Sequence, residues 1–327
     1  MSTFLELDHV TKTFGSKGVF GGGSVTVAVD DVSLAIDDDK PDIVTVVGES
    51  GSGKTTLARL LLGSHVPTSG VVRYRGKDFT KLTRKERLSF RREIQPIFQD
   101  PFESYNPFYK VDHVLEAPIK NFRLTSSASE QNRMIEDALE MVGLLPEETL
   151  GRFPHQLSGG QRQRIMVARA LLLKPRVILA DEPVSMVDAS LRATILDSIR
   201  RLNKDLGISV VYITHDLTTA YQISDSIMVM YRGTVVEAGS VDAVILNPQH
   251  TYTQLLIESI PQPDPKNRWG AEPPQQNWDI EDTEIVGCKF SDRCPTPTED
   301  CKNGKIEMGL IEVAPDHFVD QCCVNCG

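Results

Sequence analysis

The most constraining feature of the chain is the glycine-rich stretch at residues 48–55, which reads Gly-Glu-Ser-Gly-Ser-Gly-Lys-Thr. It follows an apolar, β-branched run at residues 43–47 that predicts a buried strand, and it precedes residues 55–62, which predict a helix. Glycines permit a tight turn whose backbone N–H groups point inward, and the helix N-terminus adds partial positive charge. We therefore predict a phosphate-binding loop of the Walker A type. The residues expected to contact the nucleotide are Gly48, Glu49, Ser50, Gly51, Ser52, Gly53, Lys54, Thr55 and Thr56.

Two side chains of this loop have distinct predicted roles. Lys54 is expected to reach the β- and γ-phosphates of ATP, and the Thr55 hydroxyl is expected to ligate Mg²⁺. The alternative interpretation is a glycine-rich turn that carries a lysine by chance. The position of the stretch between a strand and a helix argues against that alternative, because the motif requires this context.

A second apolar run, residues 176–180, ends in the adjacent carboxylates Asp181 and Glu182. Burying two carboxylates at the end of a strand is costly unless a cation compensates, and Mg²⁺ together with Lys54 supplies that compensation. We expect Asp181 to hold Mg²⁺ through a water molecule and Glu182 to polarise the attacking water. A solvated Asp-Glu turn is the alternative interpretation.

Residues 157–161, Leu-Ser-Gly-Gly-Gln, precede a helix predicted at residues 159–173 and offer a second anion-binding helix N-terminus. With the two motifs above, they make residues 3–260 resemble the ATP-binding-cassette (ABC) ATPases. The resemblance implies that two ATPase subunits sandwich ATP, and that Ser158 and Gly160 contact the γ-phosphate of ATP bound to the second subunit. The residues assigned to this contact are Ser158, Gly159, Gly160 and Gln161.

The resemblance also assigns roles to residues outside these motifs. Gln99 would touch Mg²⁺ and the attacking water, and His215 would hydrogen-bond the γ-phosphate, although a structural cap is its alternative role. Phe14 would stack on adenine unless it is a buried core residue. Asp188 would lie at the dimer interface, although the preceding Met-Val departs from the family's commoner Ala-Leu. The catalytic residues of the active ATPase predicted in this way are Glu182, His215 and Gln99, and its Mg²⁺ ligands are Thr55, Gln99 and Asp181.

The expected fold class is α/β, a P-loop NTPase with a RecA-like core, an antiparallel β subdomain and a helical subdomain. The predicted nucleotide-binding domain spans residues 1–260, with the helical subdomain at residues 99–173. Several prolines at residues 261–287 predict an extended linker. Residues 288–327, the C-terminal extension, form a small cysteine-rich segment.

Composition limits the classes of function that remain. The net charge of −10 argues against a nucleic-acid-binding surface. No apolar stretch approaches the ~20 residues of a membrane-spanning helix, and the N-terminus does not resemble a signal peptide. We therefore expect a cytoplasmic protein whose membrane role depends on separate subunits.

All six cysteines lie in the C-terminal extension. A cytosolic chain keeps its thiols reduced, so disulfides are not expected, and a bound metal would replace a hydrophobic core. The Cys-x-x-Cys at residues 323–326 has zinc-like spacing but no second pair, while four thiolates also suit a [4Fe–4S] cluster. From the residues alone, zinc and iron–sulfur both remain open.

A closer resemblance narrows this choice. Residues 99–107, residues 247–253 and the Gly-Cys-Lys-Phe to Arg-Cys-Pro stretch at residues 287–295 resemble the oligopeptide/dipeptide-type importer ATPases. Some members of that group hold a [4Fe–4S] cluster in this extension, which is the preferred prediction over Zn²⁺ or unliganded thiols. Either Cys323 or Cys326 could replace the fourth ligand. The cysteines implied as ligands are Cys288, Cys294, Cys301 and Cys322.

The predicted function is the ATP-hydrolysing motor of an ABC importer, bound peripherally at the cytoplasmic face of the cell membrane. The resemblance implies a second ATPase subunit, identical or different, two transmembrane permease subunits and an extracytoplasmic solute-binding protein. Oligopeptides or dipeptides are the commonest cargo of this group, and oligosaccharides and nickel are alternatives. The sequence of residues 185–192 weakly favours the oligosaccharide branch. A non-transport ABC ATPase acting on ribosomes or DNA is the alternative class, but the chain has one cassette and no long heptad region. A small-molecule kinase leaves residues 157–161 unexplained.

Overall fold

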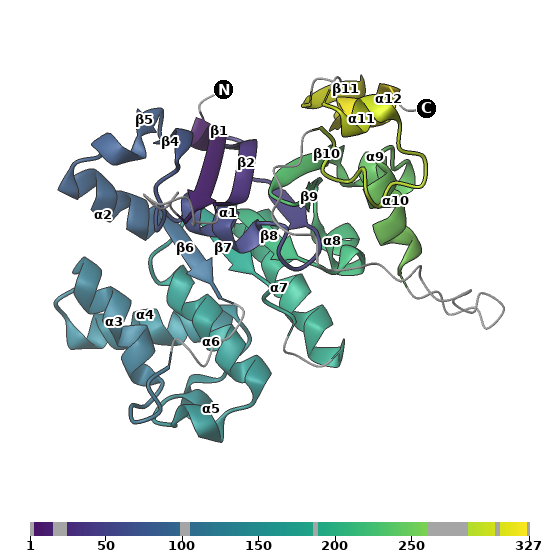
Figure 1. The fold of residues 1–327 in the computed structure, drawn as a ribbon. Helices are drawn as coiled ribbons and strands as arrows, with labels where there is room; N and C mark the ends of the chain where they lie inside the picture. The colour runs from purple at the N-terminus through teal and green to yellow at the C-terminus, as the bar shows by residue number, and fades with distance from the viewer. Residues whose placement is uncertain are drawn as a thin grey trace.

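A computed structural model of the chain describes residues 3–15, 25–98, 105–185, 189–260, 287–304 and 308–325. Two sheets organise these residues (Figure 1). The smaller sheet is antiparallel in the order β2-β1-β4-β5, and its long strands pair Leu7 with Leu34 and Leu5 with Tyr74. Its strands are β1 (Thr3–Phe14), β2 (Thr26–Asp37), β4 (Ser69–Tyr74) and β5 (Lys77–Asp78).

The larger sheet has the order β11-β12-β10-β9-β3-β8-β7-β6. From β9 to β6 its neighbouring strands are parallel, and the central β3 and β8 are buried along their whole length. Continuous runs of apolar, β-branched residues are what a strand covered on both faces requires. The strands are β3 (Ile43–Val47), β6 (Ile94–Ile97), β7 (Val177–Asp181), β8 (Ser209–Thr214), β9 (Ser226–Tyr231), β10 (Thr234–Ser240), β11 (Leu310–Ala314) and β12 (His317–Asp320).

The C-terminal extension continues this sheet. Strand β12 pairs antiparallel with β10, bringing Ala238 opposite Phe318, and β11 pairs with β12 in turn. The hairpin therefore covers an edge that β10 would otherwise expose.

Helices surround both sheets, and the described part of the segment at residues 99–173 is helical. Its helices α3 to α6 gather at one end of the molecule, below β6 in Figure 1. Among the described residues, no helix is long and apolar enough to cross a membrane. The helices are α1 (Lys54–Leu61), α2 (Arg84–Glu93), α3 (Asp112–Phe122), α4 (Ala128–Met141), α5 (Pro146–Thr149), α6 (Gly159–Leu171), α7 (Ala189–Leu206), α8 (Leu217–Ile223), α9 (Val241–Leu246), α10 (Thr251–Glu258), α11 (Glu299–Lys302) and α12 (Gln321–Asn325).

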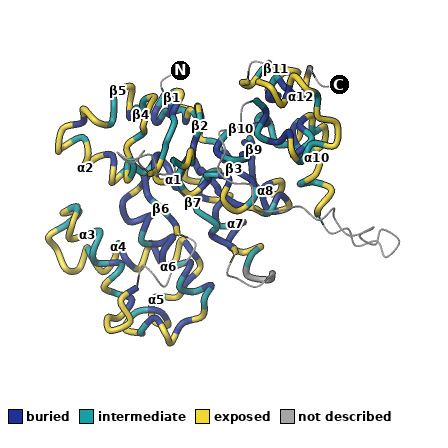
Figure 2. The backbone as a smooth tube through the Cα atoms, in the orientation of Figure 1, coloured by how far each residue is buried: buried dark blue, intermediate teal, exposed yellow. Residues whose placement is uncertain are grey.

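The hydrophobic core follows the central strands, where buried backbone is concentrated in Figure 2. One of its clusters joins the C-terminal extension to the sheet. In that cluster the rings of Tyr231 and Tyr252 lie 4.6 Å apart, and Phe290 of the extension lies 5.2 Å from Tyr231 and 5.5 Å from Tyr252. Burial of three aromatic rings fixes the extension beside the end of β9.

Candidate functional site

The predicted phosphate loop leaves the buried strand β3 and ends where α1 begins. Gly53 is the N-cap of α1 and has φ +103°. A Cβ at Gly53 would lie 2.2 Å from the Ala28 carbonyl oxygen, so only glycine fits there. Ser50, Gly51 and Thr55 face solvent, whereas Gly48 and Ser52 are buried. The loop therefore presents an open surface on a tightly packed base.

Lys54 lies across this loop. Its side-chain nitrogen donates hydrogen bonds to the carbonyl oxygens of Gly48 at 2.7 Å and Glu49 at 2.8 Å. Burial lowers the pKa of Lys54, while the nearby carboxylates of Glu182, Asp181 and Glu49 act in the opposite direction. The ammonium group is thus held beside both predicted acidic residues.

The two acids stand where β7 ends, one strand away from β8 in the parallel sheet. Burial and the charge of Glu182 raise the pKa of Asp181, a direction that a bound cation would reverse. Glu182 has φ +45°, an unusual backbone conformation for a residue with a Cβ, and its N–H donates to the Ile213 carbonyl at 2.9 Å. Strained residues of this kind gather at functional sites when the surrounding structure holds them.

His215 follows β8 and meets Glu182. Its Nδ1 lies 3.1 Å from Glu182 Oε1, and the histidine side chain is 59% exposed. A cavity of about 270 Å³ adjoins both residues. Arg192, which the sequence analysis did not single out as a site residue, also lines that cavity and contacts Asp216 at 3.2 Å.

Ser158 is the exposed N-cap of α6. Its hydroxyl accepts a hydrogen bond from Gln161 N–H at 3.2 Å, and the Gln161 side chain accepts one from Ser158 N–H at 2.9 Å. A Cβ at Gly159 would meet no atom within 4 Å, which shows that this helix end has an open face.

Of the remaining residues predicted to bind the nucleotide, the structure describes Phe14 but not the other two. Phe14 is 40% exposed and packs edge-on against His65 at 5.5 Å, which excludes the alternative of a buried core residue. Gln99 and Asp188 lie outside the described residues.

The C-terminal extension contains a second cavity, of about 190 Å³, which we call the cysteine-lined cavity. All four cysteines implied as ligands line it, and Cys323 joins them. The expectation of reduced thiols is wrong at one position, because Cys301 is disulfide-bonded. The other described cysteines are free, namely Cys288, Cys294, Cys322 and Cys323.

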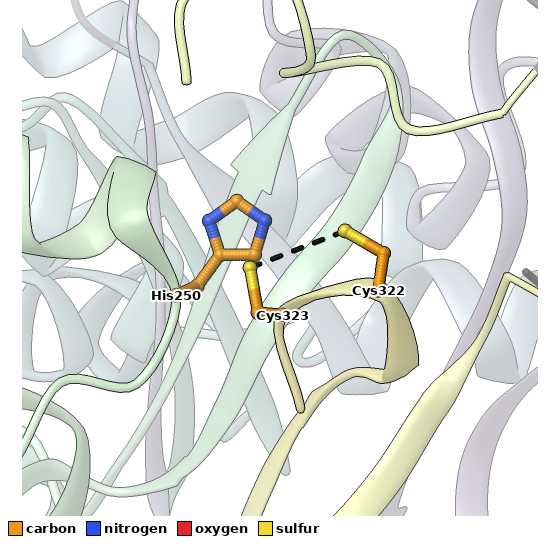
Figure 3. Close-up of side chains that lie close together, drawn as sticks. All are labelled: His250, Cys322 and Cys323. Atoms are coloured by element: carbon orange, nitrogen blue, oxygen red, sulfur yellow. Dashed lines mark hydrogen bonds between the residues drawn. The ribbon is translucent and has the colours of Figure 1, made fainter. Parts of the chain in front are cut away.

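His250 belongs to this cavity and was missed by the sequence analysis, although it lies in the quoted stretch at residues 247–253. It is fully buried, and its ring approaches Cys322 and Cys323 so that the possible ligand atoms lie within 4.8 Å of one another (Figure 3). Its Nδ1 accepts a hydrogen bond from Tyr252 N–H at 3.0 Å, while its Nε2 has no conventional partner.

The thiols and this imidazole polarise one another. Burial lowers the pKa of His250, but Cys288 and Cys323 outweigh it and raise that pKa to about 9. Hydrogen bonding from Cys322, aided by His250, lowers the pKa of Cys288 to about 5 and that of Cys323 to about 4. The same hydrogen bonds raise the pKa of Cys322, which donates them. Thiolates are the form of cysteine that binds metals, so Cys288 and Cys323 suit a thiophilic metal group.

Comparisons with known proteins agree with this geometry. The family described as "ABC transporter" matches residues 29–185, and "Oligopeptide/dipeptide transporter, C-terminal region" matches residues 236–301. The dipeptide transport ATP-binding protein DppF of Haemophilus influenzae is 40% identical over 296 residues, covering 88% of this chain and 87% of that protein. The oligopeptide transport ATP-binding protein OppF of the same organism is 37% identical over 314 residues, covering 92% of each.

Solved structures resemble the chain over its cassette. The dimeric post-hydrolysis state of the ATP-binding cassette MJ0796, bound to ADP and Pi, has a TM-score of 0.64 and 30% identity. The structural match covers 73% of this chain and 99% of the MJ0796 chain. The fold and site therefore define an ABC ATPase. Within that class, the chain belongs to the ATP-binding subunits of the oligopeptide/dipeptide transporter family, and it is an ATP-hydrolysing motor subunit of an ABC importer.

Proposed function

We propose that residues 1–260 form the nucleotide-binding domain and work as one half of an ATP-sandwich dimer. Ser158 and Gly160 of each subunit would contact the γ-phosphate of ATP held by the phosphate loop of the other, with Asp188 at the interface between them. The exposed α6 N-terminus at Ser158 supports this, since an open helix end provides unpaired N–H groups for an anion. Phe14, exposed beside Lys12, would stack on adenine.

Within one subunit, the contacts of Lys54, Glu182 and His215 support a hydrolytic mechanism. Lys54 would exchange its bonds to loop carbonyls for bonds to the β- and γ-phosphates. Glu182 would accept a proton from the attacking water, whose oxygen bonds to the γ-phosphorus while ADP leaves. The observation that carries this proposal is the 3.1 Å contact between His215 Nδ1 and Glu182 Oε1, because it orients the base at the cavity.

Mg²⁺ fits the same site. Asp181 is a partly buried carboxylate next to a second one, and Thr55 is an exposed residue in the first turn of α1. We propose Thr55, Asp181 and Gln99 as the residues that hold the ion, directly or through water. When bound, Mg²⁺ would neutralise charge on the phosphate oxygens.

The transported solute is proposed to be a peptide. The relatives reported above are named for dipeptides and oligopeptides. None of those reported is named for a sugar, the cargo that residues 185–192 weakly favoured. The chain would act with a second ATPase subunit, two permeases and a solute-binding protein, peripherally at the cytoplasmic face of the membrane.

The cysteine-lined cavity is proposed to hold a [4Fe–4S] cluster on Cys288, Cys294, Cys301 and Cys322, once Cys301 is reduced. A cubane of eight atoms needs a cavity of this kind, whereas a single zinc ion touches all its ligands and leaves no space. Cys323 and His250 would lie beside it as hydrogen-bonding neighbours. Zinc is the second candidate, because, within the part of the chain that the structure describes, His250, Cys322 and Cys323 offer ligand atoms within 4.8 Å of one another.

Two experiments test these proposals. Sedimentation of Glu182→Gln with ATP and Mg²⁺, alone and with the other transporter subunits, should show an ATP-dependent ATPase dimer that Ser158→Arg abolishes. A chain that never dimerises with ATP, or dimerises regardless of Ser158, would contradict the sandwich. Iron and sulfide assays on anaerobically purified protein should find both elements, whereas zinc-loaded, iron-free protein would support the second candidate.

A further inference from the structure

Arg293 of the C-terminal extension binds a residue of the phosphate loop. Its Nη1 lies 2.8 Å from Glu49 Oε2, and its Nη2 lies 3.0 Å from Glu49 Oε1. The arginine side chain is 16% exposed and the glutamate side chain 35%. Two parallel charge-assisted bonds between a guanidinium and a carboxylate are stronger and more directional than an ordinary surface ion pair.

The surroundings of Arg293 hold it in this position. The guanidinium lies 5.7 Å from the ring centre of Phe290 and 5.8 Å from that of Tyr231. Arginine stays protonated in proteins, so the guanidinium keeps its positive charge in this position. The Tyr252 hydroxyl also accepts a hydrogen bond from the Glu49 N–H at 2.9 Å. The C-terminal part of the chain therefore fixes Glu49 through both its backbone and its side chain.

Glu49 is electrostatically unfavourable in a phosphate-binding loop, because its carboxylate adds negative charge next to the site for an anion. Lys54, which would bind the phosphates, now donates to the Glu49 carbonyl. With Arg293 in place, the Glu49 charge is neutralised and the loop keeps its shape. With Arg293 removed, the carboxylate is free to repel the phosphates or to compete for Lys54.

We propose that Arg293 is a positioning residue of the ATP site, which neutralises and holds Glu49 so that the C-terminal extension sets the affinity for ATP. The neighbouring Cys294 lines the cysteine-lined cavity. A structural change in that cavity would therefore be transmitted to the phosphate loop through Arg293. The inference rests on the proposed role of the phosphate loop. Wild-type protein that fails to bind ATP would contradict that role rather than the role of Arg293.

The test measures the Kd for ATP on the full chain by calorimetry, and KM and kcat on the assembled transporter. Arg293→Gln should raise the Kd by about tenfold, while kcat at saturating ATP stays within about twofold. Lys302→Gln removes the same charge from an exposed position of the extension and should leave the Kd within about twofold. Circular dichroism and iron content verify that each variant is folded and loaded.

Three further variants separate charge compensation from simple tethering. Arg293→Lys keeps the charge and should recover most of the lost affinity. Glu49→Gln should bind ATP more tightly than wild type, because the loop then has an unpaired Arg293 beside the phosphates. The double variant Glu49→Gln with Arg293→Gln should return the Kd to within about threefold of wild type. An unchanged Kd in folded Arg293→Gln, or a double variant as weak as Arg293→Gln alone, would overturn the proposal. If Arg293→Gln does not fold, weaker ATP binding by Glu49→Gln would overturn it instead.

Discussion

Glu237 of β10 is the residue whose replacement most directly tests how the C-terminal extension is attached. It is fully buried, and its carboxyl oxygens accept hydrogen bonds from Gln249 N–H at 2.8 Å, His250 N–H at 3.0 Å and His317 Nε2 at 2.7 Å. One side chain thus joins β10, the turn before α10 and strand β12 of the extension. We predict that Glu237→Gln loosens the extension without altering the rest of the sheet.

The magnitude follows from those three bonds. The amide keeps one acceptor oxygen but replaces the other with an NH₂ group, which faces a buried donor. A buried donor left unsatisfied costs about 1–3 kcal/mol, and weakening the remaining bonds adds to that, so we expect about 2–4 kcal/mol in total. By the constant of 1.4 kcal/mol per factor of ten, local opening becomes about 30- to 700-fold more frequent.

Native-state amide hydrogen exchange measures this local opening directly. The amides of β12 should exchange faster by the factor above in Glu237→Gln, while those of β3 and β8 stay unchanged. Glu312→Gln on β11 is the matched control, because Glu312 is exposed and its replacement should have no measurable effect. Exchange in β12 within about threefold of wild type would refute the reasoning.

Three further predictions concern the phosphate loop, a partly buried carboxyl group just before β3, and the cysteine-lined cavity. Gly53→Ala places a Cβ against the Ala28 carbonyl, so ATP affinity measured by calorimetry should fall by about a hundredfold or more, and normal binding would contradict the close approach. Burial and Asp225 raise the pKa of Asp42 from 3.8 to about 6, so the folded chain binds this proton more tightly than the unfolded one. The resulting stability is present below about pH 4 and lost as pH rises through about 6; Asp42→Asn should abolish that loss in urea titrations across this range, and an unchanged pH profile would refute it. Anaerobic removal of iron should increase the number of thiols that react with an alkylating agent, whereas an unchanged number would show that the cysteines are not ligands.

The local structure around the predicted nucleotide site could be predicted, because residues within each motif determine its backbone conformation. The run at residues 43–47 is β3 with the same bounds, and the helix predicted at residues 159–173 is α6, which ends two residues earlier. Glycines, a β-branched run and a capping box act over a few residues, so their effect is visible in sequence. Ser158 accordingly caps α6 as expected, while α1 begins at Lys54, one residue before the predicted start.

Contacts made across long sequence separations could not be predicted in the same way. The pairing of β12 with β10, the approach of His250 to Cys322 and the bond from Arg293 to Glu49 each join residues far apart in the chain. None has a local signal, because burial and packing select the partner. The one general indication concerned His250, because a histidine within a motif that precedes a cysteine-rich segment is a possible metal neighbour.

We propose that Glu182 drives ATP hydrolysis and that this hydrolysis is coupled to a permease. The most direct measurement is ATPase activity of wild type and Glu182→Gln, each with and without co-purified permease subunits. We predict hydrolysis that changes when permeases are bound and falls by at least about a hundredfold in Glu182→Gln. Glu182-dependent hydrolysis that ignores permeases but responds to ribosomes or DNA, or turnover that survives in Glu182→Gln, would contradict it.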